Sequence, residues 1–289
     1  MNFKKFNFKF YFLFFTALLT IQSCSLFEPV SPIASYLHID SIFVQTDYQT
    51  QGSNSNTITD VWVIYDNAYL GTFPLPADIP LIGEGSHNLI IKAGIVENGI
   101  FGTRAAYPKY NSFDTTMILS ATKTTYLSPD VTYGSSSSFP QIEDFDDASL
   151  SLVTTTTGTV PLTITQQSDP NSFEGNSGNA TLDSANSIFE VASSSSFELP
   201  LNTTSYLELN YKCDVGFDVG VFITSSSGIV KSNLLFIKAS SEWKKIYINL
   251  SNTGGVVSGA FNYKIFLHAE KSSLLTADNL YFDNLKVVF

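Results

Sequence analysis

Apolar and polar residues alternate in short stretches along much of the chain from residue 36 to residue 289. The clearest stretch is 206–224, where odd positions such as Leu207, Leu209 and Val219 are apolar and most even positions are polar. A period of two residues places alternate side chains on opposite faces of a β-strand. Residues 36–133 show no helical period of useful length. The pattern therefore predicts an all-β protein.

The predicted strands form two groups, separated by Gly134, a run of serines and Pro140. The first group has the size and turn spacing of a small sandwich, and the second has about eight short strands joined by Ser, Gly and Asn turns. We therefore expect two β-sandwich domains, an immunoglobulin-like one at 36–133 and a jelly roll at 143–289, with a Ser-rich linker at 134–142.

The first two dozen residues have the order of a secretory signal peptide. Lys4, Lys5 and Lys9 precede an apolar run over 10–21, which ends shortly before Cys24. This run is shorter than the about 20 apolar residues that a bilayer-spanning helix needs. We therefore expect residues 1–23 to be a signal peptide that is removed on export.

Ile21-Gln22-Ser23-Cys24 resembles the lipobox of bacterial lipoproteins. The resemblance implies that Cys24 is the first residue of the mature protein and carries a covalent lipid, and residues 24–35 would then form a tether. Ser25 follows the cysteine, and under the sorting rule known for some Gram-negative bacteria the absence of Asp there implies the outer membrane. The protein would be lipid-anchored and either periplasmic or surface-exposed. The alternative is an ordinary secretory signal with a cysteine there by chance.

Composition narrows the classes of partner. Charged residues make up only 14% of the chain, and the formal net charge is −11. Nucleic acid is excluded as a partner because binding phosphates needs clusters of Lys and Arg. With Cys24 lipidated, Cys213 has no partner for a disulfide, and its apolar neighbours at alternate positions predict a buried, inert thiol.

Part of the first domain has a recognisable pattern. Residues 63–71, with the turn pair Asp66-Asn67, are followed by Pro-Leu-Pro at 74–76 and by Gly-Ser-His-Asn-Leu-Ile-Ile at 85–91. These segments resemble PEGA-type domains, although Asn67 replaces the usual turn glycine. The resemblance implies an immunoglobulin-like structural or interaction module at the cell envelope, without chemistry of its own.

The second domain resembles jelly-roll carbohydrate-binding modules and galactose-binding-like domains. The residues that carry the resemblance are Glu-Asp-Phe-Asp at 143–146, the loop 172–178, the segment 242–248 and Tyr-Phe-Asp-Asn-Leu at 281–285. The resemblance spans nearly all of 143–289. It implies a sandwich that binds a glycan, although many domains of this kind bind no sugar.

One carboxylate in the last predicted strand needs a partner. Asp283 shares a face with Tyr281, Leu285 and Val287, and burying a carboxylate without a partner costs several kcal/mol. In the resembled modules this aspartate helps to hold a structural Ca²⁺, which needs six to eight oxygen ligands. We therefore treat as candidate calcium ligands Glu143, Asp144, Asp146, Glu174 and Asp283. The alternative is that Asp283 caps a turn or accepts backbone N–H bonds.

Two predicted strands carry mixed aromatic and polar residues on the face turned away from the core. If these strands share a sheet, that face suits a sugar, because an aromatic ring packs on the C–H face and polar groups bind hydroxyls. The candidate glycan-binding residues are Trp243, Lys245, Tyr247, Phe266 and His268. One alternative is that this face covers the first domain. Another is that Trp243 packs at a sheet edge after a bulge.

Motifs for catalysis are absent from the sequence. There is no His-Glu-x-x-His, no Gly-x-Ser-x-Gly, no phosphate-binding glycine loop and no Cys-x-x-Cys. We therefore expect no enzyme, and a glycoside hydrolase would need two carboxylates that face each other across a cleft. The sequence predicts a lipid-anchored envelope protein that binds a glycan through its second domain. The alternative is a non-catalytic scaffold that binds another envelope protein.

Overall fold

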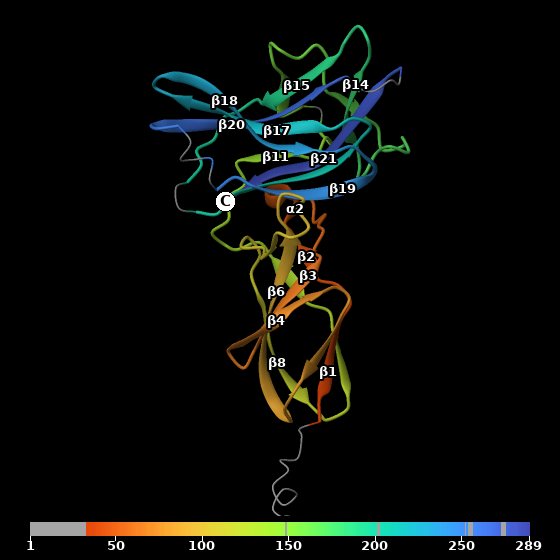
Figure 1. Cartoon of the computed structure of the whole chain (residues 1–289), viewed down its shortest axis with the longest axis vertical. Coiled ribbons are helices and arrows are strands. Elements are labelled where there is room, and N and C mark those ends of the chain that lie inside the picture. Colours follow the sequence, from red (N-terminus) through yellow and green to blue (C-terminus); the bar gives the residue numbers. More distant parts are fainter. Residues whose placement is uncertain (1–32, 148, 201–202, 252, 254–256, 273–275) are drawn as a thin grey trace, which may run out of the picture.

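The computed structural model describes residues 33–289, except 148, 201–202, 252, 254–256 and 273–275. The predicted signal peptide, Cys24 and most of the predicted tether lie outside the described residues. The described chain is almost entirely β-structure, arranged as two β-sandwich domains (Figure 1). The predictions of an all-β fold and of two sandwiches are confirmed. Among the described residues, no helix is long and apolar enough to cross a membrane.

The first domain contains a five-stranded sheet of order β4-β3-β6-β7 in which β8 also pairs with β6, a three-stranded sheet of order β5-β1-β9, and the pair β10-β2. Its elements are β1 (Ser35–Ile39), β2 (Phe43–Gln45), the one-turn helix α2 (Tyr48–Gln51), β3 (Asp60–Tyr65), β4 (Ala68–Pro74), β5 (Ala77–Leu81), β6 (Gly85–Val96), β7 (Arg104–Ala106), β8 (Phe113–Leu119), β9 (Thr124–Leu127) and β10 (Asp130–Thr132).

The second domain packs a six-stranded sheet, of order β13-β14-β21-β16-β19 with β11 beside β21, on a five-stranded sheet of order β12-β15-β20-β17-β18. Its strands are β11 (Gln141–Glu143), β12 (Leu152–Thr154), β13 (Thr163–Thr165), β14 (Ser177–Leu182), β15 (Ile188–Ser193), β16 (Tyr206–Cys213), β17 (Phe217–Ser225), β18 (Gly228–Ile237), β19 (Ser240–Asn249), β20 (Ala260–Glu270) and β21 (Asp278–Val288).

The predicted turn at Asp66-Asn67 joins β3 to β4. Both residues have positive φ, 47° and 64°, which a tight two-residue hairpin turn requires at both central positions. Asn and Asp reach this left-handed conformation more readily than other non-glycine residues. Asn67 is therefore suited to its place in this turn.

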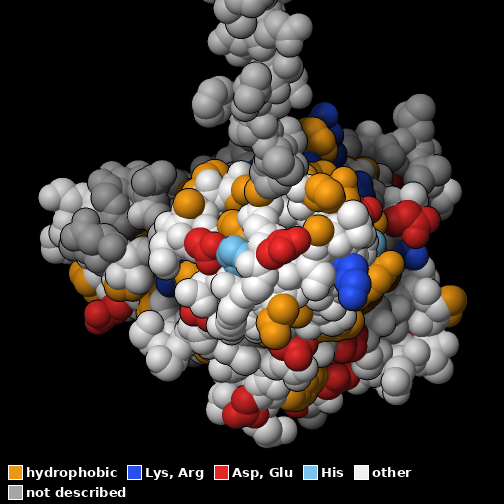
Figure 2. All heavy atoms as spheres, turned by 90° about the horizontal axis from the view of Figure 1, so that it is seen from below, with side chains coloured by type: hydrophobic (Ala, Val, Ile, Leu, Met, Phe, Trp, Pro, Cys, Tyr) orange, Lys and Arg blue, Asp and Glu red, His pale blue; other side chains and the backbone are white. Residues whose placement is uncertain are grey.

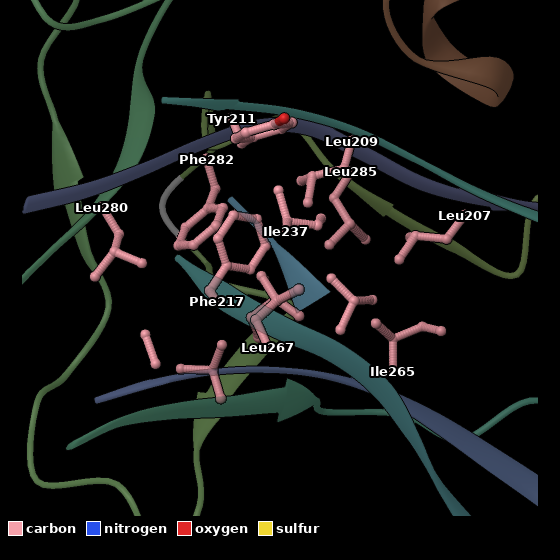
Figure 3. Packing of buried hydrophobic residues seen from close by; sticks show 14 of the residues in the cluster. Leu207, Leu209, Tyr211, Phe217, Ile237, Ile265, Leu267, Leu280, Phe282 and Leu285 are labelled. Carbon is pink, nitrogen blue, oxygen red and sulfur yellow. The ribbon is translucent and has the colours of Figure 1, made fainter. Parts of the chain in front are cut away.

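The core of the second domain follows the alternation in the sequence. Leu207 and Leu209 of β16 point into the sandwich and meet Phe217, Ile265 and Leu267 from the facing sheet (Figure 3). All of these side chains are fully buried. Glu208 and Asn210, the polar residues at alternate positions of β16, therefore lie on the opposite face of the sheet.

That opposite face of β16 is covered. The buried cluster of the first domain continues onto the second domain through Tyr206, Tyr247 and Val288. In Figure 1 the first domain lies below β19 and β21, and α2 lies directly beneath this sheet. The outer face of the six-stranded sheet is thus the junction between the two domains.

Candidate functional site

A buried carboxylate lies at the centre of the domain junction. Glu208 is completely buried, and its Oε1 accepts hydrogen bonds from the hydroxyls of Tyr107 and Tyr133 of the first domain, each at 2.7 Å. The Nζ of Lys245 lies 3.1 Å from the other oxygen, Oε2. Burial by itself would raise the pKa of Glu208, but the charges of Lys245 and Lys286 and the tyrosine hydroxyls hold it below its ordinary value. Glu208 is therefore ionised and its charge is compensated.

A second buried charge binds the backbone of the first domain. The Nζ of Lys286, on β21, donates to the carbonyl oxygens of Gln51 at 2.6 Å and Ser53 at 2.7 Å. These carbonyls lie at the end of α2 and just beyond it. Burial lowers the pKa of Lys286 to about 8. Lys286 thus ties the central strand of the sheet to the helix of the first domain.

Tyr247 is buried against the first domain. Its side chain is 1% exposed, its hydroxyl accepts a hydrogen bond from the backbone N–H of Thr57 at 3.1 Å, and its ring centroid lies 5.0 Å from that of Tyr107. Its carbonyl oxygen accepts from the backbone N–H of Asn98 at 2.8 Å. Tyr247 and Lys245 therefore stabilise the junction, and neither presents the open sugar-binding surface predicted from the sequence.

Trp243 has a different environment, although it lies on the same face of β19. It lines a groove of about 460 Å³ at the domain junction, here called the junction groove. Its walls comprise residues 55–57 and 59 of the first domain with Val96 and Gly99, and, from the second domain, Phe173, Asn210, Tyr211 and residues 243–247. The junction groove thus combines aromatic rings with amides, hydroxyls and lysines.

The indole ring of Trp243 contacts Phe173 on one side and is partly exposed. Its ring centroid lies 5.2 Å from that of Phe173, with a tilt of 42° between the planes. Its Nε1–H is buried and has no hydrogen-bond acceptor among the described residues. A buried donor without a partner costs about 1–3 kcal/mol. On the neighbouring strand β16, Asn210 Oδ1 accepts from the hydroxyl of Ser55, in the first domain, at 3.1 Å.

Phe266 and His268 do not join this site. They lie on β20, which belongs to the five-stranded sheet, whereas β19 belongs to the six-stranded sheet. The condition that both strands share a sheet is therefore not met, because the chain crosses from one sheet to the other between β19 and β20. Phe266 is fully buried beneath Lys231, whose Nζ lies 4.7 Å from the ring centroid. His268 Nδ1 lies 3.0 Å from Glu190 Oε2.

The predicted calcium ligands lie near the junction, where protein donors bind them. Glu143 accepts from the backbone N–H groups of Phe145 and Ser151. Tyr48 of α2 donates its hydroxyl to Asp144 at 2.9 Å, and Asp146 accepts from the backbone N–H of Asn176 at 2.7 Å. The alternative predicted for Asp283, acceptance of backbone N–H bonds, agrees with the structure: the N–H groups of Glu174 and Asn284 donate to it. The hydroxyl of Ser177 is a further donor, at 2.8 Å.

Glu174 completes this group of carboxylates. Its Oε2 accepts from the hydroxyl of Ser53 at 2.5 Å and from the side-chain amide of Asn284 at 3.0 Å. Across the described residues, no three His, Cys, Asp or Glu side chains are grouped so that they could hold a metal ion. Calcium binding stays a prediction of the sequence. Burial raises the pKa of Asp283 to about 7.

Sequence reasoning missed Glu208, Lys286 and Phe173 as residues of the junction. The alternation of residues 206–224 correctly predicts that Glu208, at an even position, faces away from the core. It does not predict that the first domain covers this face. The available signal was composition, since β16 and β21 carry charged residues in otherwise apolar strands. Among the described residues that line the junction groove there is neither a carboxylate nor a histidine.

No protein-family model matches the chain, and no curated protein matches it. Solved structures are similar to it at low identity. One, described by the promiscuous specificity of carbohydrate-binding modules from the β-sandwich superfamily, has 13% identity and a TM-score of 0.36 and covers 80% of this chain and 85% of that one. The C-terminal family 22 carbohydrate-binding module of Clostridium thermocellum Xyn10B has 10% identity, a TM-score of 0.37 and coverage of 52% and 92%.

The enzymatically active domain of bacteriophage CBA120 tailspike protein 4 is also similar, with 13% identity and a TM-score of 0.35. The match covers 47% of this chain and 18% of the tailspike chain, so this protein spans only a small part of that structure. Most of these neighbours are carbohydrate-binding modules by their descriptions. TM-scores this low give no ground for transferring a ligand.

Proposed function

We propose that this protein is a non-catalytic glycan-binding protein of the bacterial cell envelope that holds its ligand in the junction groove. A lipid on Cys24 would hold it at the outer membrane. The observation that carries the proposal is Trp243, a partly exposed aromatic residue that lines the groove beside the ring of Phe173. The lipid anchor is supported by the lipobox-like sequence at residues 21–24 alone.

The groove has the mixture of groups that sugars need. A sugar ring presents an apolar C–H face, which packs on an aromatic ring, and hydroxyls, which need donors and acceptors. Trp243 and Phe173 supply the rings, while Asn56, Asn210 and Ser55 supply amide and hydroxyl groups. A volume of about 460 Å³ lies within the range of about 300–1,000 Å³ that is usual for ligand pockets. A short segment of a polysaccharide fits this space.

A glycan array tests the proposal. The full protein, purified in a polyoxyethylene detergent that carries no sugar, is applied to the array beside Trp243→Ala and Phe173→Ala. The control is Tyr126→Ala, which removes an aromatic ring that is 76% exposed in the first domain, away from the groove. We expect binding by the protein and the control, and a loss of about tenfold or more in both groove variants.

Thermal melting of each variant shows whether a loss of binding comes from unfolding. Loss of glycan binding in the folded Trp243 and Phe173 variants, with Tyr126→Ala intact, would support the groove as the site. Equal binding by all four proteins would show that the glycan binds outside the junction groove. Absence of binding to any glycan by the folded protein would overturn the proposal.

One observation favours a second candidate function, a scaffold that binds another envelope protein. The side chains of Tyr247 and Lys245 are buried in the domain junction. Hydrogen bonds across the junction, such as that from Lys286 to the carbonyl oxygen of Gln51, hold the second domain at a fixed orientation on the first. A fixed two-domain rod is what a structural spacer needs. Capture of a specific envelope protein after crosslinking in cells, unchanged in Trp243→Ala, would favour the scaffold.

A further inference from the structure

A second hollow adjoins the junction groove around the edge strand β19. It has a volume of about 360 Å³ and shares four wall residues with the groove: Gly99, Tyr211, Lys244 and Ile246. Its other walls include Phe236 and Lys238, from the end of β18 and the turn into β19. The two hollows thus adjoin at Lys244, which lines both, so a single extended ligand could contact both.

The charged residues that line these two hollows are all basic. The walls carry Lys238, Lys244 and Lys245 and, among the described residues, no Asp, Glu or His. The chain as a whole has 15 basic and 26 acidic side chains. On the face of the molecule seen in Figure 2, acidic side chains are spread widely and basic ones are sparse. The exposed lysines of the two hollows, Lys238 and Lys244, therefore form a small local positive surface on an acidic protein.

The three lysines differ in whether a carboxylate of the protein already neutralises their positive charge. Lys245 is buried and forms an ion pair with Glu208 at 3.1 Å. Lys238 and Lys244 are exposed, and within the described part of the chain neither forms an ion pair with a carboxylate. Their ammonium groups are thus available to an anion from outside, close to the rings of Trp243 and Phe236.

We infer that the ligand of the junction groove is an acidic polysaccharide, a chain of sugars that carries carboxylate or sulfate groups. This inference rests on the proposed function and adds the chemical class of the glycan. A sugar ring packs on Trp243, and anionic groups of the chain pair with Lys244 and Lys238. A neutral glycan would leave both ammonium groups unused, and the net charge of the protein would repel an acidic chain at most other surfaces.

Affinity electrophoresis tests this inference. The full protein in polyoxyethylene detergent migrates through gels that contain polygalacturonate, dextran sulfate, neutral dextran or neutral hydroxyethylcellulose. The groove variant is Lys238→Gln with Lys244→Gln. The matched control is Lys92→Gln with Lys123→Gln, which removes the same charge from exposed positions of the first domain. The polygalacturonate and dextran sulfate gels separate carboxylate from sulfate recognition.

We expect retention by at least one acidic polymer, a Kd about tenfold weaker in the groove variant, and little change in the control. Raising the salt concentration weakens the binding because the lysines are exposed. Equal retention by neutral and acidic polymers, or equal effects of both double variants, would overturn the inference. Binding to a neutral polymer that depends on Trp243 but not on the lysines would overturn it too, while leaving the proposed function intact. Absence of binding to every polymer would overturn the inference, whereas the proposed function would be overturned only by a glycan array without a hit.

Discussion

The hydroxyl of Tyr107, in the first domain, lies 2.7 Å from Oε1 of Glu208, in the second domain. Both residues are buried, so the hydrogen bond joins two cores rather than two surfaces. Tyr133 makes an equivalent bond to the same oxygen, and Lys245 compensates the charge from the other side. A buried ion pair gives little net stability, but removing one partner leaves an uncompensated charge. The junction therefore depends on Glu208 more than on any single apolar contact across it.

Glu208→Gln should strongly destabilise the protein. The substitution keeps the size of the side chain but leaves Lys245 buried without its counter-charge, which costs about 3–5 kcal/mol. We expect the free energy of unfolding in urea, followed by tryptophan fluorescence, to fall by about this amount. Glu198→Gln, at an exposed position of the second domain, should change it by no more than about 0.5 kcal/mol. A small effect in Glu208→Gln would show that the junction does not depend on this carboxylate.

Part of this picture could be predicted from the sequence. Alternation placed Leu207 and Leu209 in the core and Glu208 on the other face, and the structure confirms both. Alternation has no information on what covers a face, so Tyr247 was predicted to bind sugar and instead packs on the first domain. Phe266 was placed beside Trp243 for a related reason: the order of strands along the chain does not fix which sheet each strand joins.

The stability of the second domain should fall as the pH rises from about 4 to 7. Burial raises the pKa of Asp283 from 3.8 to about 7, so the folded state keeps a proton that the unfolded state has lost in this window. The contribution of this group is fully present below pH 4 and is lost as the pH passes 7, by about 4 kcal/mol at most. Asp283→Asn should remove that part of the dependence.

The measurement is urea unfolding at a series of pH values between 4 and 8 for the protein, for Asp283→Asn and for Asp114→Asn. Asp114 is exposed on β8 and serves as the control. The unfolding free energy of Asp283→Asn minus that of the unchanged protein should increase as the pH rises. The same difference for Asp114→Asn should not change with pH. A flat difference for Asp283→Asn as well would show that its carboxyl group has an ordinary pKa.

Chelation should leave the melting temperature unchanged. Glu143, Asp283 and Glu174 already accept hydrogen bonds from protein donors, and a structural Ca²⁺ would have to displace several of them. We expect melting curves in EDTA and in millimolar Ca²⁺ to coincide, with Mg²⁺ as the control for ionic strength. A rise of several degrees that only Ca²⁺ produces would instead support the calcium site that the sequence suggests.

The membrane anchor should depend on one sulfur atom. If the lipobox-like segment directs lipidation, Cys24→Ala removes the only attachment point for the lipid and the protein should move from the membrane fraction to the soluble fraction after cell lysis. Cys213→Ala is the matched control, because burial raises the pKa of its thiol to about 11 and keeps it unreactive. Metabolic labelling with a fatty acid should mark the protein and Cys213→Ala but not Cys24→Ala. Membrane retention of unlabelled Cys24→Ala would mean that another part of the chain holds the protein at the membrane.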